Sequence, residues 1–364
     1  MVTSPFVVYD GSGAAALTTA LLAANGGGIV VDTSSIVLHA SGSDVVNFYD
    51  GSIAGLGIGA GLLFTSGTTP GTSNTSSGFG TDNSGTSGTS NGDADIDAVV
   101  NHVFQTQSYD ATTLGFAFSV TDPNATSISF DLVFGSDEYP EWVDAFVDSA
   151  VVMVNGVNYA LFNHDPNAPL SVISSNLAAG YFQDNNGTNL LAVEYDGVSH
   201  VLKIVAPIIA GQTNTIKIGI ADTGDHILDS GIFLANLSAG TTPGSGVVDN
   251  PGGGTTGDDT CTGSSKSEYF DLLAGNDIAY AGGGDDIVVA GAGKDQVFGG
   301  SGNDELKGDS GDDWLDGGAD VDTAVYSGAS SAYNLSYDVL TGVTTVSDTQ
   351  GPEGLDSLVG IELL

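Results

Sequence analysis

Residues 272–316 read LLAGNDIAY, AGGGDDIVV, AGAGKDQVF, GGSGNDELK and GDSGDDWLD, five successive blocks of nine residues without a gap. Each block has glycine at its fourth position, aspartate at its sixth and an apolar residue at its eighth. The same phase extends outward to units that begin at Gly263 and Gly317. A flexible Gly/Asp-rich tail has no reason to keep this phase over seven units, so the pattern predicts a repeat structure.

The pattern G-G-x-G-x-D-x-U-x resembles the RTX family of calcium-binding β-roll repeats. Each unit is then a tight turn followed by a very short strand. Glycine permits the dihedral angles of the turn and lets backbone carbonyl oxygens point inward, while the apolar eighth residue fills the interior. Two units make one coil, so that residues eighteen apart stack. We therefore expect a parallel β-roll over residues 261–328.

The resemblance implies that Ca²⁺ ions lie between stacked turns and take oxygens from the backbone and from the sixth-position aspartates. Hard oxygen ligands at high coordination number favour Ca²⁺ over zinc or copper, and several ions are expected. The implied ligand residues are the fourth-position glycines and the sixth-position aspartates: Gly275, Gly284, Gly293, Gly302, Gly311, Asp277, Asp286, Asp295, Asp304, Asp313 and Asp322. The stacked pairs are Asp277 with Asp295, Asp286 with Asp304, Asp295 with Asp313 and Asp304 with Asp322. Glu268, Lys266 and Asp320 depart from the pattern and mark the end units as caps.

Stacked carboxylates repel one another, and bound calcium offsets that repulsion. The free energy of calcium binding is then free energy of folding. Extracellular calcium modules often have dissociation constants of roughly 10⁻⁴–10⁻³ M. We therefore expect the roll to be unfolded in a calcium-poor cytoplasm and to fold outside the cell.

The charge balance is extreme: 45 acidic residues oppose five lysines, without an arginine, for a formal charge of −40. Such a chain does not bind nucleic acid through phosphate contacts, and anionic membrane surfaces repel it. The content of hydrophobic residues, 41%, is nevertheless sufficient for buried cores. The single cysteine, Cys261, rules out a disulfide framework within the chain.

The region before the repeat is predicted to be all-β, a β-sandwich or jelly roll. Apolar and β-branched runs separated by turn signals are typical of this class, and they occur at residues 114–120, 128–134, 150–154, 157–162, 190–195, 198–206, 215–220 and 232–237. The dipeptides Asn155-Gly156 and Asp196-Gly197 suit type I′ turns and predict two hairpins.

Four segments follow from this reading: a sandwich domain (1–239), a Gly/Pro/Thr linker (240–260), the roll (261–328) and a C-terminal segment (329–364). Within the first, residues 14–24 predict an amphipathic helix, and residues 67–92 a long surface loop. The start has no basic stretch typical of a Sec signal. The C-terminal segment resembles the region that follows RTX repeats in type I secretion substrates, which implies an uncleaved export signal. An ordinary β-cap on the roll is the alternative.

The first region also resembles the choice-of-anchor L domain of bacterial surface and secreted proteins. The motifs that carry the resemblance are ALTTALLAANGGGIVV (16–31), IAGLGIGAGLLFTSG (53–67), GDADIDAVV (92–100), ISFDLVFGSDEYPEWVDAFVDSAVVMVNG (128–156) and IGIADTGDHILDSGIFL (218–234). Members of this family reach the cell surface by means of different C-terminal segments, and an RTX tail would be one such segment. The resemblance implies location more clearly than it implies mechanism.

Two acidic clusters in this region are candidates for a second class of Ca²⁺ site. One contains Asp137, Glu138, Glu141, Asp144 and Asp148; the other contains Asp222, Asp225 and Asp229, with His226 among them. Asp137, Glu138, Asp222 and Asp225 are the predicted ligands. The alternative is a solvated acidic rim or a set of caps on loop backbone. The spaced acids Asp93, Asp95 and Asp97 lack the glycine and distal glutamate of an EF-hand loop.

Signatures of catalysis are weak. Residues 88–92 match G-x-S-x-G but lie in a low-complexity Gly/Ser/Thr run rather than at a strand-to-helix elbow. The chain also has no HExxH motif. We expect a non-enzymatic protein that is secreted or held at the cell surface, where it acts in adhesion or in a biofilm matrix, and we expect no membrane span. The expected partners are calcium, copies of itself or glycans, and the type I secretion machinery. A polysaccharide hydrolase using Glu138 and Glu141, or a calcium-dependent glycan-binding protein, is the alternative.

Overall fold

A computed structural model describes most of the chain: residues 4–11, 13–40, 42–67, 69–71, 92–139, 143–144, 147–162, 166–178, 181–185, 191–223, 230–240, 246–249, 257–263 and 267–364. The chain divides into two compact units. The first contains residues 1–240 and 245–247, and the second contains residues 241–244 and 248–364.

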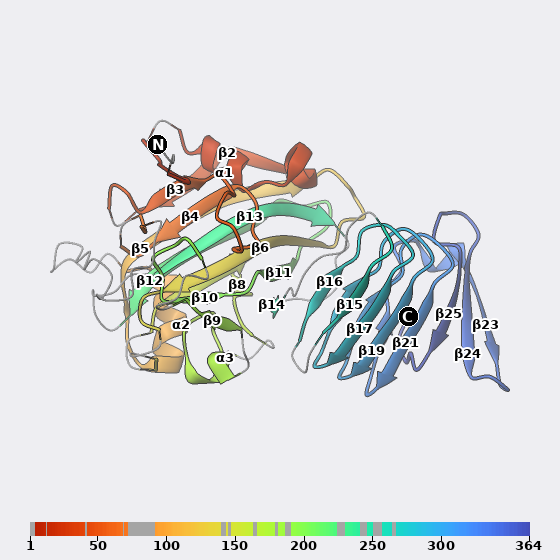
Figure 1. The fold of residues 1–364 in the computed structure, drawn as a ribbon. Coiled ribbons are helices and arrows are strands. Elements are labelled where there is room, and N and C mark those ends of the chain that lie inside the picture. Colours follow the sequence, from red (N-terminus) through yellow and green to blue (C-terminus); the bar gives the residue numbers. More distant parts are fainter. Residues whose placement is uncertain are drawn as a thin grey trace. The chain divides into compact units, whose positions relative to one another are not determined.

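The first unit is built from two antiparallel sheets (Figure 1). The large sheet has the order β1-β3-β4-β13-β6-β10-β9, with β11 on β6 and β14 on β11. Its strands are β1 (Phe6–Val8), β3 (Val46–Tyr49), β4 (Gly61–Thr65), β6 (Ser127–Ser136), β9 (Phe182–Asp184), β10 (Gly197–Ser199), β11 (Leu202–Pro207), β13 (Ser230–Gly240) and β14 (Gly246–Asp249). The small sheet has the order β2-β5-β12-β7-β8. Its strands are β2 (Ile29–His39), β5 (Ser108–Val120), β7 (Ser149–Val154), β8 (Val157–Asn158) and β12 (Asn214–Thr223).

The main core lies between these two sheets, as expected for the predicted sandwich. Alternate residues of each strand point inward, so Phe130 and Phe134 of β6 share one buried cluster with Phe116 and Phe118 of β5. Burying aromatic and aliphatic side chains contributes about 1.5–3 kcal/mol each. The prediction of an all-β sandwich is therefore confirmed.

The outer face of the large sheet is buried as well. Segments 53–58 and 191–195 cover Leu63, Val133 and Phe233. The small sheet is covered on its outer face by α2 (Ala94–Phe104), whose Ile96 and Val100 pack on it. Burial on both faces explains why strands such as β4 read as continuous apolar runs rather than as alternating ones.

The remaining helices are short: α1 (Ala15–Leu21), α3 (Ser174–Ala178), η1 (Ala24–Gly28) and η2 (Ser330–Ala332). Helix α1 confirms the helix predicted near residues 14–24, and it buries Leu17 and Leu21. Most of the loop predicted at 67–92, residues 72–91, lies outside the described residues. Among the helices described, none has the length and apolar character needed to cross a bilayer.

One predicted hairpin is confirmed and the other is wrong. Asn155 and Gly156 have φ of 51° and 82° and join β7 to β8. Residues 191–195 form no strand, and β10 pairs with β9 instead. The buried amide of Asn185 explains this, because it accepts from the Leu191 N–H and donates to the carbonyls of Val193 and Tyr195. A side chain thus replaces a partner strand.

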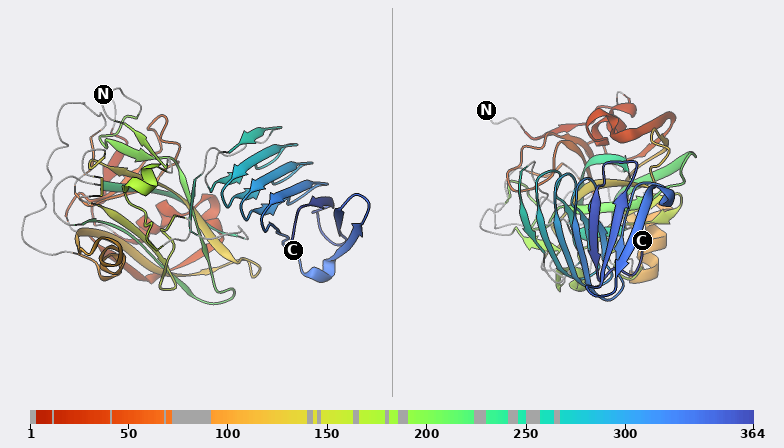
Figure 2. Two further views of the ribbon diagram at one scale, coloured as in Figure 1. Left: turned by 90° about the horizontal axis from the view of Figure 1, so that it is seen from below. Right: turned by 90° about the vertical axis from the view of Figure 1, so that its right-hand side faces the viewer.

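The second unit differs from the first in that most of its strands are parallel, and they form two sheets (Figures 1 and 2). The strand pairs within residues 333–359 are antiparallel. The first roll sheet contains β15 (Thr260–Thr262), β17 (Ile278–Gly283), β19 (Gln296–Ser301), β21 (Trp314–Ala319), β25 (Leu355–Val359), β24 (Val343–Asp348) and β23 (Tyr333–Asp338), in that order. The second roll sheet contains β16 (Tyr269–Asp271), β18 (Ile287–Val289), β20 (Glu305–Lys307) and β22 (Thr323–Ala324).

The register confirms the predicted coil. Ile278 pairs with Gln296, and Gln296 with Trp314, so equivalent positions lie eighteen residues apart. The interior is formed by the eighth-position residues of the repeat: Phe270, Ala279, Val288, Val297, Leu306, Leu315 and Ala324. The tail closes this interior, since Val346 and Leu358 belong to the same cluster. Strand β14, in the segment predicted as linker, was not anticipated.

Replacement of Gly135 by alanine tests the packing of the first unit. An added Cβ would lie 2.3 Å from the ring of Tyr195. Overpacking of this kind costs roughly 1–3 kcal/mol, and each kcal/mol lowers Tm by about 2–4 °C in a domain of this size. Calorimetry of the full chain at fixed calcium should show this loss. Gly115→Ala, where the nearest atom is at 3.7 Å, is the control and should leave Tm nearly unchanged.

Candidate calcium centre

The sixth-position aspartates of the roll form two columns linked by backbone hydrogen bonds. In one column the Asp277 N–H donates to Asp295 Oδ1 at 2.8 Å, and the Asp295 N–H donates to Asp313 Oδ1 at 2.9 Å. In the other column the Asp286 N–H donates to Asp304 Oδ1 at 2.8 Å, and the Asp304 N–H to Asp322 Oδ1 at 2.9 Å. The four pairs implied by the repeat are therefore stacked neighbours.

The second carboxylate oxygen of each of these aspartates is buried. Within the described residues, Oδ2 has no hydrogen-bond partner in Asp277, Asp286, Asp295, Asp304, Asp313 and Asp322. All six side chains are at most 3% exposed. A buried carboxylate oxygen without a donor costs several kcal/mol. The six Oδ2 atoms lie in register along the two columns. A series of bound cations would supply the missing partners of these oxygens.

At the turn glycines beside these columns, the backbones of successive coils lie in close contact. Gly293 has a φ of 154°, and a Cβ built on it would lie 1.6 Å from the carbonyl oxygen of Gly275. Gly311 has a φ of 143° and would meet the Gly293 carbonyl at 1.5 Å. Only glycine permits such an approach. The carbonyl oxygens of successive coils are thus stacked close to the aspartates, as the implied ligand set requires.

The burial of the aspartates raises their pKa. For each aspartate, burial is the largest cause of the raised pKa, and the negative charge of neighbouring carboxylates raises the pKa further. The pKa of Asp286 rises to about 9, that of Asp313 to about 7 and that of Asp304 to about 6. The pKa values of Asp277, Asp295 and Asp322 are also raised, mainly by burial. In the absence of metal, burial and the neighbouring carboxylates thus disfavour the ionised form of these side chains.

The C-terminal segment extends both columns, which the repeat pattern alone did not predict. The Asp313 N–H donates to Asp356 Oδ1 at 2.9 Å, and the Asp322 N–H donates to Glu362 Oε2 at 2.9 Å. The second oxygen of Asp356 accepts from the Tyr326 hydroxyl at 2.9 Å. A signal existed, because Gly354, Asp356 and Leu358 repeat the G-x-D-x-U spacing of the roll.

The donors fit calcium. Carboxylate and carbonyl oxygens are hard ligands, and Ca²⁺ accepts six to eight of them in flexible geometry. No group of three or more His, Cys, Asp or Glu side chains suited to a metal occurs among the residues that the structure describes. Further oxygen atoms are available beside the paired aspartates from the backbone carbonyls of the turn glycines: Gly275, Gly284, Gly293, Gly302 and Gly311.

Comparison with known families agrees with this geometry. The model for the RTX calcium-binding nonapeptide repeat matches residues 254–288, 262–297 and 290–324. The model for the choice-of-anchor L domain matches residues 10–240, more than half of the chain. The chain belongs to the choice-of-anchor L domain family. It carries RTX repeats that bind calcium, and the pair of families indicates a secreted or cell-surface bacterial protein.

Neither matched model describes an enzyme family. A search of curated proteins found no match to the sequence.

The acidic residues predicted as metal ligands in the choice-of-anchor L domain have different environments. Glu138 and Asp222 are buried, and Asp137 is half-buried. Asp144 accepts hydrogen bonds from the backbone and hydroxyl of Ser174. Asp225 lies outside the described residues, together with Glu141, His226 and Asp229. Asp148, which was placed in the first cluster, is buried beside Glu138.

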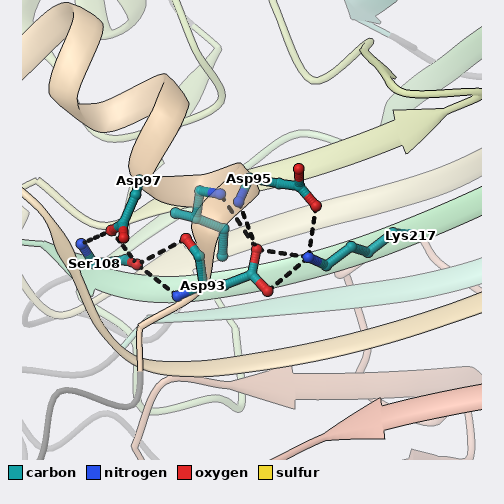
Figure 3. A network of polar contacts seen from close by, with 6 residues as sticks. Asp93, Asp95, Asp97, Ser108 and Lys217 are labelled. Atoms are coloured by element: carbon teal, nitrogen blue, oxygen red, sulfur yellow. Dashed lines mark hydrogen bonds and ion pairs between the residues drawn. The ribbon is translucent and has the colours of Figure 1, made fainter.

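Asp93, Asp95 and Asp97 have a structural role (Figure 3). Asp93 is the N-cap of α2 and accepts from the Asp95 N–H at 3.0 Å. The Lys217 ammonium lies 2.6 Å from Asp93 and 2.7 Å from Asp95. Asp97 accepts from the backbone and hydroxyl of Ser108. These carboxylates anchor the helix to β5 and β12.

Asp295→Asn should weaken calcium binding with little effect on the coil. The asparagine oxygen can still accept from the Asp277 N–H, but the amide nitrogen cannot bind a cation. Because supporting contacts alone change metal affinity by 10–100-fold, the midpoint of a calcium titration should rise by more than about tenfold. Asp285→Asn is the control, since Asp285 is exposed and accepts from the backbone and the side-chain amide of Asn303. Equal midpoints for the two variants would contradict the assignment.

The pH dependence of the metal-free roll follows from the raised pKa values. An aspartate has a pKa of about 3.9 when unfolded, and those of Asp304, Asp313 and Asp286 rise to about 6, 7 and 9 in the fold. The folded state binds more protons, so its stability is greatest below about pH 4 and falls as pH rises through 6 to 9. Circular dichroism in calcium-free buffer should show more roll structure at pH 4 than at pH 8, and added calcium should remove the difference.

Proposed function

We propose that this protein is an exported component of a bacterial surface or extracellular matrix, and that external calcium switches its roll from unfolded to folded. One observation carries the proposal: the two columns of buried aspartates whose Oδ2 atoms lack a hydrogen-bond partner within the described residues. A chain with only five lysines has few cations of its own to neutralise them. Calcium from outside supplies the missing charge.

The expected affinity places the switch between two compartments. Extracellular calcium modules typically bind with dissociation constants of roughly 10⁻⁴–10⁻³ M. At cytoplasmic calcium such sites stay empty, and the repulsion between stacked carboxylates opposes folding. An unfolded roll suits export by type I secretion machinery, and folding outside the cell would then oppose return.

Self-assembly is the part of this function that the second unit supports best. Strand β23 ends the order of the first roll sheet, and it carries Leu335 and Tyr337, which are more than half exposed. Val339 and Leu340 follow in the turn and are 80% and 92% exposed. An apolar edge strand is a template for pairing with another chain. The charge of −40 opposes contact between copies until cations screen it.

A calcium titration of the full chain tests both parts. Circular dichroism should show the roll folding, and light scattering should show larger species over the same range. The double variant Leu335→Lys and Leu340→Lys should still fold with calcium but remain monomeric. Val157→Lys, at an exposed edge of the small sheet, is the matched control and should assemble like the wild type. Wild-type protein that folds but stays monomeric at millimolar calcium would exclude self-assembly.

A further inference from the structure

The two sheets of the roll differ in length at their C-terminal end. The first roll sheet continues beyond β21 through β25, β24 and β23, whereas the second roll sheet has no strand after β22. Next to β22 there is only a single bridge, between Thr323 and Leu363. Within residues 267–364, all of which the structure describes, the second roll sheet therefore supplies no strand to face β24 and β23 (Figure 1).

The inner face of these two strands continues the interior of the roll. Val346 of β24 and Leu358 of β25 belong to the interior cluster, and Tyr333 of β23 packs against it. Leu335 pairs with Val346 and so points to the same face of the sheet. Tyr337 lies two residues further along β23 and shares that face.

Beyond the cluster this inner face is uncovered. Leu335 is 57% exposed and Tyr337 is 63% exposed, and we call this pair the open strip. The other face of β23 carries Asn334, Ser336 and Asp338, which are exposed as well. An antiparallel strand with one apolar and one polar face is typical of a sheet that buries one side. The open strip thus has the pattern of a buried face but lacks the layer that would bury it.

The charge of this region differs from that of the rest of the chain. Among residues 327–347 only Asp338 is charged, and its carboxylate accepts from the Leu340 N–H at 2.9 Å. The chain as a whole carries 45 acidic residues and five lysines. Like charge keeps copies of such a chain apart, and this repulsion is weakest where two uncharged segments meet. The charge pattern therefore favours contact between two open strips over contact elsewhere on the second unit.

We propose that the open strip packs face to face against the open strip of a second copy, in a dimer with two-fold symmetry; this proposal rests on the self-assembly described under the proposed function. A two-fold contact uses the same patch on both copies, so an apolar strip is its own complement. Each copy supplies the layer that the other lacks. Two sheets then pack across an apolar interface, as they do inside the roll.

The same geometry makes the dimer depend on calcium. Strand β25 pairs in parallel with β21, and the Asp313 N–H donates to Asp356 of β25 at 2.9 Å. In the sheet order, β24 and β23 are attached to the roll through β25. The open strip is therefore presented on a folded roll, and dimers should form over the calcium range in which the roll folds.

A pair of lysine variants on one strand tests the face-to-face contact. At millimolar calcium chloride, Leu335→Lys in the full chain should raise the dimer dissociation constant by more than about 100-fold, because each copy loses a buried leucine and gains a charge in the interface. Ser336→Lys places the same charge on the polar face of the same strand and should dimerise like the wild type. Sedimentation equilibrium measures the constants, and circular dichroism checks that both variants fold with calcium.

The outcomes separate this dimer from self-assembly in general. Equal losses in Leu335→Lys and Ser336→Lys would overturn face-to-face packing and leave calcium-dependent self-assembly intact. A mass that grows without limit as protein concentration rises, and that Leu335→Lys abolishes, would overturn the two-fold contact in favour of a head-to-tail one. Monomeric wild-type protein that binds phosphatidylcholine vesicles would assign the open strip to a lipid surface, and it would exclude the dimer and self-assembly together.

Discussion

The hydrogen bonds from the sixth-position N–H groups to the carboxylates of the next coil organise the whole second unit. They align the carboxylates of successive coils and leave one oxygen of each aspartate buried. This alignment explains the glycines, because stacked turns approach more closely than any Cβ allows. It also explains the need for a cation, since the aligned charges repel one another in an environment that excludes water.

The first unit is stabilised differently. Its two sheets bury aromatic and aliphatic side chains between them, and further segments cover both outer faces. Some of its acids are used locally, as in the cap and ion pairs that hold α2 at Asp93.

The tail illustrates how a roll can end without a further repeat. Asp356 and Glu362 continue the two columns, and Tyr326 donates to the oxygen of Asp356 that would otherwise be buried without a partner. The segment thus closes the stack with side-chain hydrogen bonds. This is the geometry of the β-cap that the sequence left open as an alternative to an export signal.

The sequence by itself determined the roll, its coil of two units and the two columns of stacked aspartates, because a fixed nine-residue phase leaves each residue one place in the coil. It also determined the sandwich class and the Asn155-Gly156 hairpin, where local turn chemistry decides the conformation. Tertiary structure decided the rest. Asn185 holds residues 191–195 out of a strand, and β-strand register brings Asp148 beside Asp222. These outcomes depend on contacts between distant segments, which neither period nor propensity encodes.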